Sequence, residues 1–375
     1  MKNTSNRTDS KAVYYGGFDP GSGKATLYLE SADGVDLAEN SATIPSVIAD
    51  GNIKTVLGRG DIDAKLADVL RKNEYAITLS NGNTHFFYDL AMKEGTNATD
   101  ALGVSGRYWS DHSRVLLMCL ASILIPEREF ELRLVTALPV TLYDKENRRR
   151  VKQALEGYYR FTFGATGCEQ DREMVVKVGY VGMEGQGILV NAGEQLGMQA
   201  ILDIGYRTTD IVVADGQSLV TRRCKGNHEI GVGLLVDDVR QYIKDHGRNP
   251  SPGLLEEIMY AYAHGKSFPK SLKGERGEDL EPGVRDVIAK SIKRVGKSLE
   301  KFISATLNTE GMNVGSDYDT LFLAGGGAYY FEDMVKALMP RVEVVTDAEY
   351  ANVYGYADLA TSLEDARPDI WGNQD

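Results

Sequence analysis

One short pattern occurs twice in the chain and constrains the fold more than any other feature. Phe18–Gly21 and Leu202–Gly205 both have the form apolar residue, Asp, any residue, Gly. Each follows an apolar stretch typical of a β-strand, and each leads into a second such stretch. The two aspartates lie 184 positions apart (203 minus 19), about half of the 375 residues. The repeat predicts two related domains, each beginning with a hairpin that carries Asp-x-Gly at its turn.

Strand-like and helix-like segments alternate along the chain, which predicts the α/β class. Residues 31–105 are mixed and polar and predict a small subdomain of short elements, and residues 1–10 predict a disordered tail. The other predicted strands and helices include Phe130–Ala137, Met174–Val181 and Thr320–Ala324 as strands, and Ser110–Leu124, Lys145–Tyr159, Ile188–Leu196 and Val284–Leu307 as helices.

The composition excludes several classes of protein. The net charge is −12, from 42 basic and 54 acidic residues, which argues against nucleic acid or anionic lipid as the main surface-wide partner. No apolar run reaches the roughly 18 residues that a membrane-spanning helix needs. Cys119, Cys168 and Cys224 lack CxxC spacing and are expected to be reduced thiols. We therefore expect a cytoplasmic protein with no membrane partner.

The first hairpin loop, Gly17–Lys24, is similar to a Walker A motif but does not fit it. That motif needs a glycine where Phe18 stands, and Ser or Thr where Ala25 stands. The next segment is also typical of a strand rather than a helix.

A turn between two strands offers another way to bind phosphate, because it can direct successive backbone N–H groups into a concave anion site. Gly21 and Gly23 permit the close approach, Ser22 can donate its hydroxyl, and Lys24 can supply a charge. Asp19, at the strand end, is expected to hold Mg²⁺ through water.

Two further loops carry the same kind of chemistry. The segment from Asp203 to Asp210 contains a carboxylate at a strand end, Gly205, and the hydroxyls of Thr208 and Thr209. Leu323–Ala328 joins a strand to a helix, and its Gly325, Gly326 and Gly327 would let a flat ring or a sugar lie against the backbone. Each loop taken alone is more often a structural turn. Their joint occurrence in this order favours a nucleotide site.

The order and spacing of these loops resemble the actin superfamily of ATPases, which includes actin, Hsp70 chaperones and sugar kinases. Within it, the chain is most similar to bacterial and archaeal actin-like proteins of the ParM and Alp type. Two other stretches carry the resemblance, Leu138-Pro139 after a strand and the connecting segment Val181–Gly187. Arg107–His112 before one helix and Gly231–Gly233 before another also resemble prokaryotic actin-like sequences.

The resemblance implies an actin-like fold, a duplicated ribonuclease H-like pair of domains with a nucleotide cleft between them. It assigns residues 11–182 and 346–375 to the first domain, with an inserted subdomain at about 31–105. It assigns residues 183–345 to the second domain, with an insertion at about 234–283.

The resemblance also implies roles for single residues. Asp19 and Asp203 would face the metal, and Asp203 with Glu184 would position the attacking water, with Gln186 as the alternative to Glu184. Ser22, Thr208 and Thr209 would donate hydrogen bonds to phosphate, and Asp210 would brace its loop. One departure concerns the family's phosphate-loop lysine, because Thr26 occupies its usual position. Lys24 either reaches the phosphates from the turn or points to solvent.

A ParM-like protein would hydrolyse ATP, with GTP as an open alternative, and assemble head to tail into filaments that segregate plasmid DNA. Its partners would be further copies of the chain and a DNA-bound adaptor, rather than DNA itself. Two alternatives share the fold. One is a small-molecule kinase, for which the sequence shows no convincing acceptor-site aspartate. The other is a non-polymerising ATPase similar to a chaperone nucleotide domain.

Overall fold

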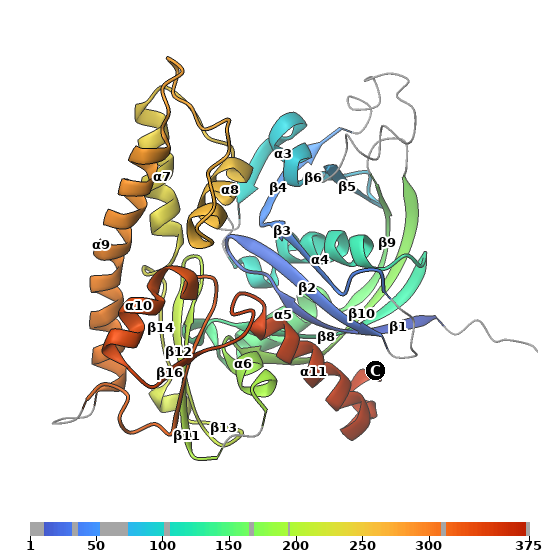
Figure 1. The fold of residues 1–375 in the computed structure, drawn as a ribbon. Coiled ribbons are helices and arrows are strands. Elements are labelled where there is room, and N and C mark those ends of the chain that lie inside the picture. The colour runs from blue at the N-terminus through green and yellow to red at the C-terminus, as the bar shows by residue number, and fades with distance from the viewer. Residues whose placement is uncertain are drawn as a thin grey trace, which may run out of the picture.

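The computed structural model describes residues 11–31, 37–52, 74–100, 106–164, 169–193, 196–308 and 313–372. The predicted tail and Cys168 lie outside these residues. Figure 1 shows two halves, a large curved sheet with its helices and a smaller sheet flanked by the long helix α9. The α/β prediction is confirmed. Within the described residues, every helix is too short or too polar to cross a lipid bilayer.

The larger sheet has ten described strands in the order β3-β2-β1-β8-β10-β9-β5-β6-β4-β7. β1 is antiparallel to β2 and parallel to β8, which is also parallel to β10. The carboxyl ends of β1, β8 and β10 therefore meet at one edge of the sheet. The strands are β1 (Ala12–Asp19), β2 (Lys24–Ser31), β3 (Ser41–Pro45), β4 (Val47–Gly51), β5 (Glu74–Leu79), β6 (Thr84–Phe87), β7 (Thr96–Asp100), β8 (Glu129–Leu138), β9 (Gly157–Phe163) and β10 (Gln170–Met183).

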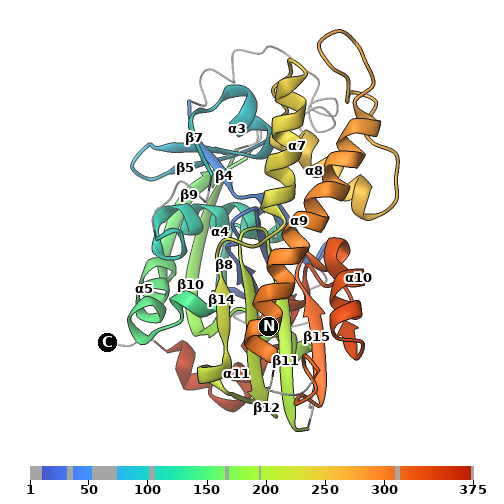
Figure 2. The same ribbon diagram turned by 90° about the vertical axis from the view of Figure 1, so that its left-hand side faces the viewer.

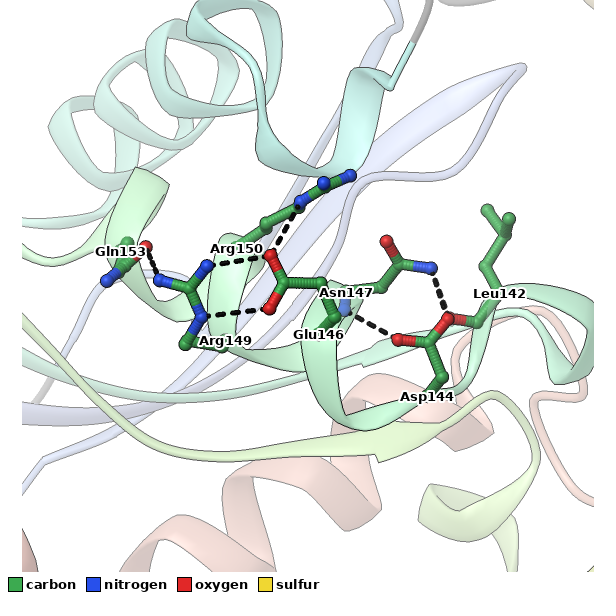
Figure 3. Close-up of polar contacts among 7 residues, drawn as sticks. All are labelled: Leu142, Asp144, Glu146, Asn147, Arg149, Arg150 and Gln153. Atoms are coloured by element: carbon green, nitrogen blue, oxygen red, sulfur yellow. Dashed lines mark hydrogen bonds and ion pairs between the residues drawn. The ribbon is translucent and has the colours of Figure 1, made fainter.

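The helices of this half differ in how their sequences meet the core. They are α3 (Tyr88–Glu94), α4 (Asp111–Leu124) and α5 (Lys145–Leu155), while α6 (Gln186–Asn191) buries Ile188 and Leu189 in the core of the second half. α4 is apolar on nearly all sides and is almost entirely buried. α5 is strongly basic and buries only Val151 and Leu155. As Figure 3 shows, Asp144 caps α5 through the Asn147 N–H at 2.8 Å, and Glu146 pairs with Arg149 and Arg150.

The smaller sheet is built from the second half of the chain. Its described order is β13-β12-β11-β15-β16, with β14 paired to β12. β11 is antiparallel to β12 and parallel to β15, and Asp203 lies opposite Ala324 in that parallel register. The strands are β11 (Met198–Ile204), β12 (Thr209–Asp215), β13 (Ser218–Leu219), β14 (Lys225–Asn227), β15 (Thr320–Ala324) and β16 (Val342–Val344).

Four helices belong to this second half: α7 (Gly233–Asp245), α8 (Pro252–Ala263), α9 (Glu281–Leu307) and α10 (Ala328–Leu338). Their buried apolar faces and the strands β11, β12 and β15 form one core cluster. In Figure 2, α9 crosses in front of this sheet, with α7 alongside its upper part.

The last helix, α11 (Ala351–Ala366), returns to the first half of the molecule. Val353, Tyr356 and Ala360 on α11 pack in a cluster with Tyr15 and Val135 of the larger sheet. Glycine permits the close contact: a Cβ on Gly17 of β1 would lie 2.0 Å from the Val353 carbonyl oxygen. The chain terminus therefore packs with the half in which the chain began.

Two predicted helices were too long. The helix predicted at Lys145–Tyr159 ends at Leu155, because Gly157 has a φ of 150° and begins the strand β9. The aromatic and β-branched residues of β9 favour a strand over a continued helix. The helix predicted at Ile188–Leu196 is α6, which ends at Asn191 before Gly193, whose φ is 77°. The described strands from residues 31–105 extend the larger sheet at both edges: β5, β6, β4 and β7 through the pairing of β5 with β9, and β3 through its pairing with β2.

Candidate functional site

A cavity of about 320 Å³ lies between the two halves, at the carboxyl ends of β1 and β11. One end is lined by carboxylates and glycine-rich turns, and the other by apolar and aromatic side chains of α7, α8 and α10. The lining includes residues from all three predicted loops: Asp19, Gly21, Ser22, Gly23, Lys24, Asp203, Gly205, Thr208, Gly325 and Gly326. The convergence of three segments so far apart in sequence is the central feature of this site.

The first hairpin loop is hydrogen-bonded to Ser46 and packs against Tyr206 of the second loop. The Ser46 hydroxyl donates to the Gly21 carbonyl at 2.6 Å, and the Ser46 N–H donates to the Gly23 carbonyl at 3.0 Å. A Cβ on Gly23 would lie 2.7 Å from the Tyr206 ring, so this glycine lets the first loop contact the second. Ser22 is largely buried and lines the cavity.

The second hairpin separates its two threonines. Gly205 N–H donates to the Thr208 carbonyl at 2.8 Å and closes the turn, and Thr208 lines the cavity. Thr209 begins β12, is fully buried, and donates its hydroxyl to the Ile230 carbonyl at 3.0 Å. Thr208 lies in the turn before β12, whereas the burial and the hydroxyl contact of Thr209 place its side chain in the core. The prediction of Thr209 as a phosphate donor is therefore wrong in this structure.

The three glycines of the third loop have different surroundings. Gly325 has a φ of 78°, and a Cβ there would lie 2.4 Å from Asp203 Oδ1. A Cβ on Gly326 would meet only Glu349 Cγ, at 4.0 Å, and Gly326 lines the cavity. A Cβ on Gly327 would lie 2.1 Å from Ile204 Cγ2. Gly327 is thus a packing residue rather than a lining residue, which corrects its predicted role.

The connecting segment after β10 distinguishes between the two candidates for orienting water. Glu184 lines the cavity, and its Oε1 accepts a hydrogen bond from the Tyr108 hydroxyl at 3.3 Å. The Gln186 side chain instead accepts from the Met183 N–H at 2.7 Å and from the Tyr180 hydroxyl at 3.3 Å. Gln186 therefore supports the start of α6 and is absent from the lining of this cavity in the described part of the chain.

Four carboxyl groups gather at this end of the site with little opposing charge. Burial raises the pKa of Asp19 to about 7, with a further increase from Asp203 and a decrease from Arg107. Burial raises the pKa of Asp203 to about 6, opposed by the Asn352 amide, which donates to Asp203 Oδ2 at 2.7 Å. Burial and the charges of Asp210, Asp19 and Asp203 raise the pKa of Glu184 well above its ordinary value.

Asp210 braces the second loop, as the sequence predicted. Its Oδ1 accepts from the Val140 N–H at 2.9 Å, which ties β12 to the segment after β8. Burial and the charge of Asp203 raise the pKa of Asp210 to about 7, and the hydrogen bonds from Val140 and Thr208 oppose this change.

This arrangement fits a hydrated Mg²⁺ ion. Among the described residues, no group of three or more His, Cys, Asp or Glu side chains could hold a metal ion. Mg²⁺ is commonly bound through one or two carboxylates together with water and substrate phosphates. Asp19 and Asp203 offer two such carboxylates, and because burial raises their pKa values, a nearby cation would favour their ionised forms.

Lys24 follows neither of the two predicted alternatives. It lines the cavity, but its Nζ forms ion pairs with Glu256 of α8 at 2.9 Å and with Glu349 at 3.3 Å. Burial alone would lower the pKa of Lys24, and the two glutamates reverse this and raise it. Lys24 therefore joins β2 to the opposite wall of the cavity through its ion pair with Glu256.

The other end of the cavity is suited to a flat apolar group. Val232, Val236, Leu255 and Met259 line it. The His264 ring lies between two tyrosines, 4.0 Å from the Tyr260 ring centre and 5.3 Å from that of Tyr329. Both tyrosines are about half exposed, so this end opens to solvent.

Sequence reasoning missed several lining residues. Asn352 joins three parts of the site: besides its bond to Asp203, its Oδ1 accepts from the Gly185 N–H at 3.0 Å and from the Tyr356 hydroxyl. No local motif marks it. Arg107 and Tyr108 belong to the Arg107–His112 stretch, but the motif by itself gave them no role. Other missed lining residues with polar or charged side chains include Tyr206, Arg207, Arg240, Glu256 and Glu349.

Comparison with known proteins assigns the family. A profile described as "Actin like proteins N terminal domain" matches residues 17–188, and one described as "Archaeal actin homologue MreB-like, C-terminal" matches residues 201–337. No match was found among curated protein sequences.

Several solved structures share the fold over nearly their whole length. An archaeal actin homologue, Ta0583, in complex with ADP has a TM-score of 0.68 and 20% identity, over 94% of this chain and 99% of that chain. A ParM from a 15-stranded filament of Clostridium botulinum has a TM-score of 0.67 and 17% identity, over 94% and 99%. The actin-like protein Alp7A has a TM-score of 0.67 and 17% identity, over 95% and 98%.

At these sequence identities the solved structures establish the fold alone. The two profiles relate each half of the chain to an actin-like domain. The chain therefore belongs to the actin-like proteins, with an actin-like N-terminal domain and an MreB-like C-terminal domain.

Proposed function

We propose that this chain binds ATP with Mg²⁺ in the cavity between its halves, hydrolyses it, and assembles into nucleotide-dependent filaments. The observation that carries the proposal is the convergence of two Asp-x-Gly hairpins and a glycine loop on one cavity with a polar and an apolar end. The polar end would take the phosphates and the apolar end the base. The ADP bound to the archaeal actin homologue supports the choice of ligand.

The proposed roles of the residues follow from where they lie. Asp19 and Asp203 would hold Mg²⁺ through water, and the ion would neutralise charge on the phosphates. Gly21, Ser22, Gly23, Gly205 and Thr208 would surround the phosphates with N–H and hydroxyl donors. Glu184 would accept a hydrogen bond from the attacking water and hold it in line, and Tyr108 would fix the orientation of Glu184.

The domain division at residues 11–182 with 346–375, and 183–345, is part of the same proposal. The packing of α11 on β1 supports the return of the terminus to the first domain. ATP would contact both domains, so hydrolysis would change how they are held together. Assembly would be head to tail, and a DNA-bound adaptor would link filaments to plasmid DNA in the cytoplasm. The filament formed by the Clostridium botulinum ParM supports self-association.

Phosphate release and sedimentation test the proposal when they are measured together, with ATP, ADP and a non-hydrolysable ATP analogue, each with Mg²⁺. We expect ATP and the analogue to give sedimenting filaments and ADP to give few. Hydrolysis without sedimentation would favour a non-polymerising ATPase. Hydrolysis that requires an added sugar or acid would favour a kinase, and GTP in parallel would establish the base preference.

A further inference from the structure

The cavity contains one cationic side chain whose role the proposed function leaves open. Among the residues that the structure describes, four basic ones other than histidine line it: Lys24, Arg107, Arg207 and Arg240. Three of them already pair with carboxylates. Lys24 pairs with Glu256 and Glu349, and both Arg207 and Arg240 pair with Asp237, at 2.7 and 2.8 Å.

Arg107 differs from these three. Its guanidinium lies over the Tyr108 ring, 4.3 Å from the ring centre, and donates a hydrogen bond to the Tyr108 hydroxyl. Its Nε is buried and has no hydrogen-bond partner among the described residues. The Arg207 Nε also lacks a partner there, but the Arg207 guanidinium is held by Asp237, whereas Arg107 forms no ion pair with a described residue. A buried guanidinium N–H without a partner destabilises the folded state, because it loses its hydrogen bonds to water and gains none within the protein. Such a group is a donor available to a ligand.

The position of Arg107 is fixed by its backbone. Gly106, with a φ of 64°, starts a 3₁₀ turn at Arg107–Trp109 that leads into α4. The Arg107 carbonyl accepts hydrogen bonds from the hydroxyls of Ser110 and Ser113 at 2.9 and 2.6 Å. The guanidinium is thus presented from a rigid turn and not from a long flexible loop.

Arg107 also lies at the phosphate end of the cavity. Its charge acts on Asp19 and Glu184, the proposed metal and water residues, and Tyr108 joins it to Glu184 through the 3.3 Å hydrogen bond. A cation there faces the place where the terminal phosphoryl group and the attacking water would meet. Lys24, in contrast, is held toward Glu256 on α8.

We propose that Arg107 is a catalytic residue, an arginine supplied by the chain itself that donates hydrogen bonds to the transferring phosphoryl group. The inference rests on the proposed ATP hydrolysis. In that reaction the bond between the terminal phosphorus and the bridging oxygen breaks and a water oxygen binds to the phosphorus. ADP, phosphate and a proton are released. Arg107 exchanges no proton, and its N–H groups stabilise the negative charge on the phosphoryl oxygens.

The test compares Arg107→Ala, Arg107→Lys and Tyr108→Phe with the wild type. Arg114→Ala is the matched control, because Arg114 pairs with Asp111 on α4 and is not among the described lining residues. Two quantities are measured with Mg²⁺ present: the hydrolysis rate, and the affinity for ADP with and without aluminium fluoride, which mimics the planar phosphoryl group. The second readout does not depend on turnover.

We expect Arg107→Ala to bind ADP alone as the wild type does and to hydrolyse ATP about 10³-fold more slowly. It should also lose the gain in ADP affinity that aluminium fluoride gives the wild type. Arg107→Lys should recover only part of both, because an ammonium lacks the planar fork of donors. Tyr108→Phe keeps the guanidinium and the ring but loses the holding hydroxyl, so it should show a smaller loss of both.

The outcomes separate the inference from the proposed function. If the wild type hydrolyses ATP and Arg107→Ala matches it in rate and in the aluminium fluoride effect, Arg107 is not catalytic. If Arg107→Ala loses ADP affinity as much as it loses rate, Arg107 binds ground-state nucleotide, and the inference is also wrong. If the wild type binds no nucleotide, the proposed function is wrong and the inference fails with it.

Discussion

Glu184 occupies the position from which a side chain can orient water without contacting the nucleotide. It lines the cavity, and the Tyr108 hydroxyl holds its carboxyl group. We predict that Glu184→Ala keeps its ATP affinity and loses about two to four orders of magnitude in hydrolysis rate, the usual range for general-base residues. Phosphate release and nucleotide titration measure the two effects. Filaments of this variant should persist with ATP, because the ADP state is not reached.

Gln186→Ala tests the competing assignment. The Gln186 side chain accepts a hydrogen bond from the Met183 N–H and is not part of the described cavity lining. Gln186→Ala should therefore hydrolyse ATP within about threefold of the wild-type rate. A loss as large as that of Glu184→Ala would return the role to Gln186. Wild-type hydrolysis in Glu184→Ala would remove Glu184 from the mechanism.

Asp19 makes the nucleotide-free protein sensitive to pH. Its pKa in the folded protein is about 7, against an ordinary value of 3.8, chiefly because of burial. Between these values the folded state binds more protons than the unfolded state, so this group's contribution to stability falls as pH rises from about 4 to about 7. We predict that Asp19→Asn is more stable than the wild type by on the order of 2 kcal/mol near pH 7.5, and shows little gain near pH 4.5.

Chemical denaturation at several pH values, without Mg²⁺ or nucleotide, measures this difference. Asp215→Asn is the control, because Asp215 is an exposed carboxylate at the end of β12. The difference in free energy of unfolding between this variant and the wild type should not change with pH. A stability gain for Asp19→Asn that does not vary with pH would contradict the origin in burial of charge.

At the scale of elements, the loop between β15 and α10 presents one open glycine. Gly326 lines the cavity and has room for a side chain, whereas Gly325 and Gly327 would clash with Asp203 and Ile204. We predict that Gly326→Leu folds with wild-type stability, to within about 1 kcal/mol. The leucine would extend into the cavity and reduce ATP affinity at least about tenfold by steric exclusion, a loss worth about 1.4 kcal/mol.

Thermal unfolding and nucleotide titration on the same samples separate the two effects. Gly253→Leu in the first turn of α8 is the matched control, because a Cβ there also meets nothing within 4 Å and Gly253 does not line the cavity described here. Normal ATP binding by Gly326→Leu would mean that the base and sugar do not lie against this loop.

At the scale of the whole molecule, Lys24 links the two walls of the cavity. Its partners Glu256 and Glu349 and its own side chain are each about one-third exposed. Ion pairs this exposed contribute about 0–1 kcal/mol, so Lys24 adds little to the free energy that holds the two walls together. We predict that Lys24→Ala lowers ATP affinity less than about tenfold, because the Lys24 amine already pairs with two carboxylates.

Nucleotide titration of Lys24→Ala and Glu256→Gln checks this prediction. Glu256→Gln removes one of the two carboxylates that hold the amine, so it should leave ATP affinity unchanged or raise it. A loss above about 100-fold in Lys24→Ala would show a charge-assisted contact with phosphate of the kind the family lysine makes.

Features that depend on local chemistry could be predicted from the order of the residues. Turns that need glycine and an aspartate at a strand end are encoded within a few residues, so the loops at Asp19, Asp203 and Gly325 could be predicted, as could the α/β class and the actin-like fold. The same holds for α9, whose apolar period is long and clear. Helix ends were harder to predict, because the backbone of Gly157 is not helical and β9 begins there, inside the helix predicted at Lys145–Tyr159.

Which side chains share the cavity depends on long-range packing and could not be predicted from local sequence. Thr208 and Thr209 are neighbours with equal chemistry, but Thr208 lies in the turn and lines the cavity, whereas Thr209 begins β12 and donates its hydroxyl to a carbonyl in the core. Arg107 and Asn352 reach the site from elements more than 200 residues apart (352 minus 107 is 245), and no short motif records that approach. Long-range packing sets these contacts, because charge, burial and direction at the cavity depend on how the two sheets and α11 meet.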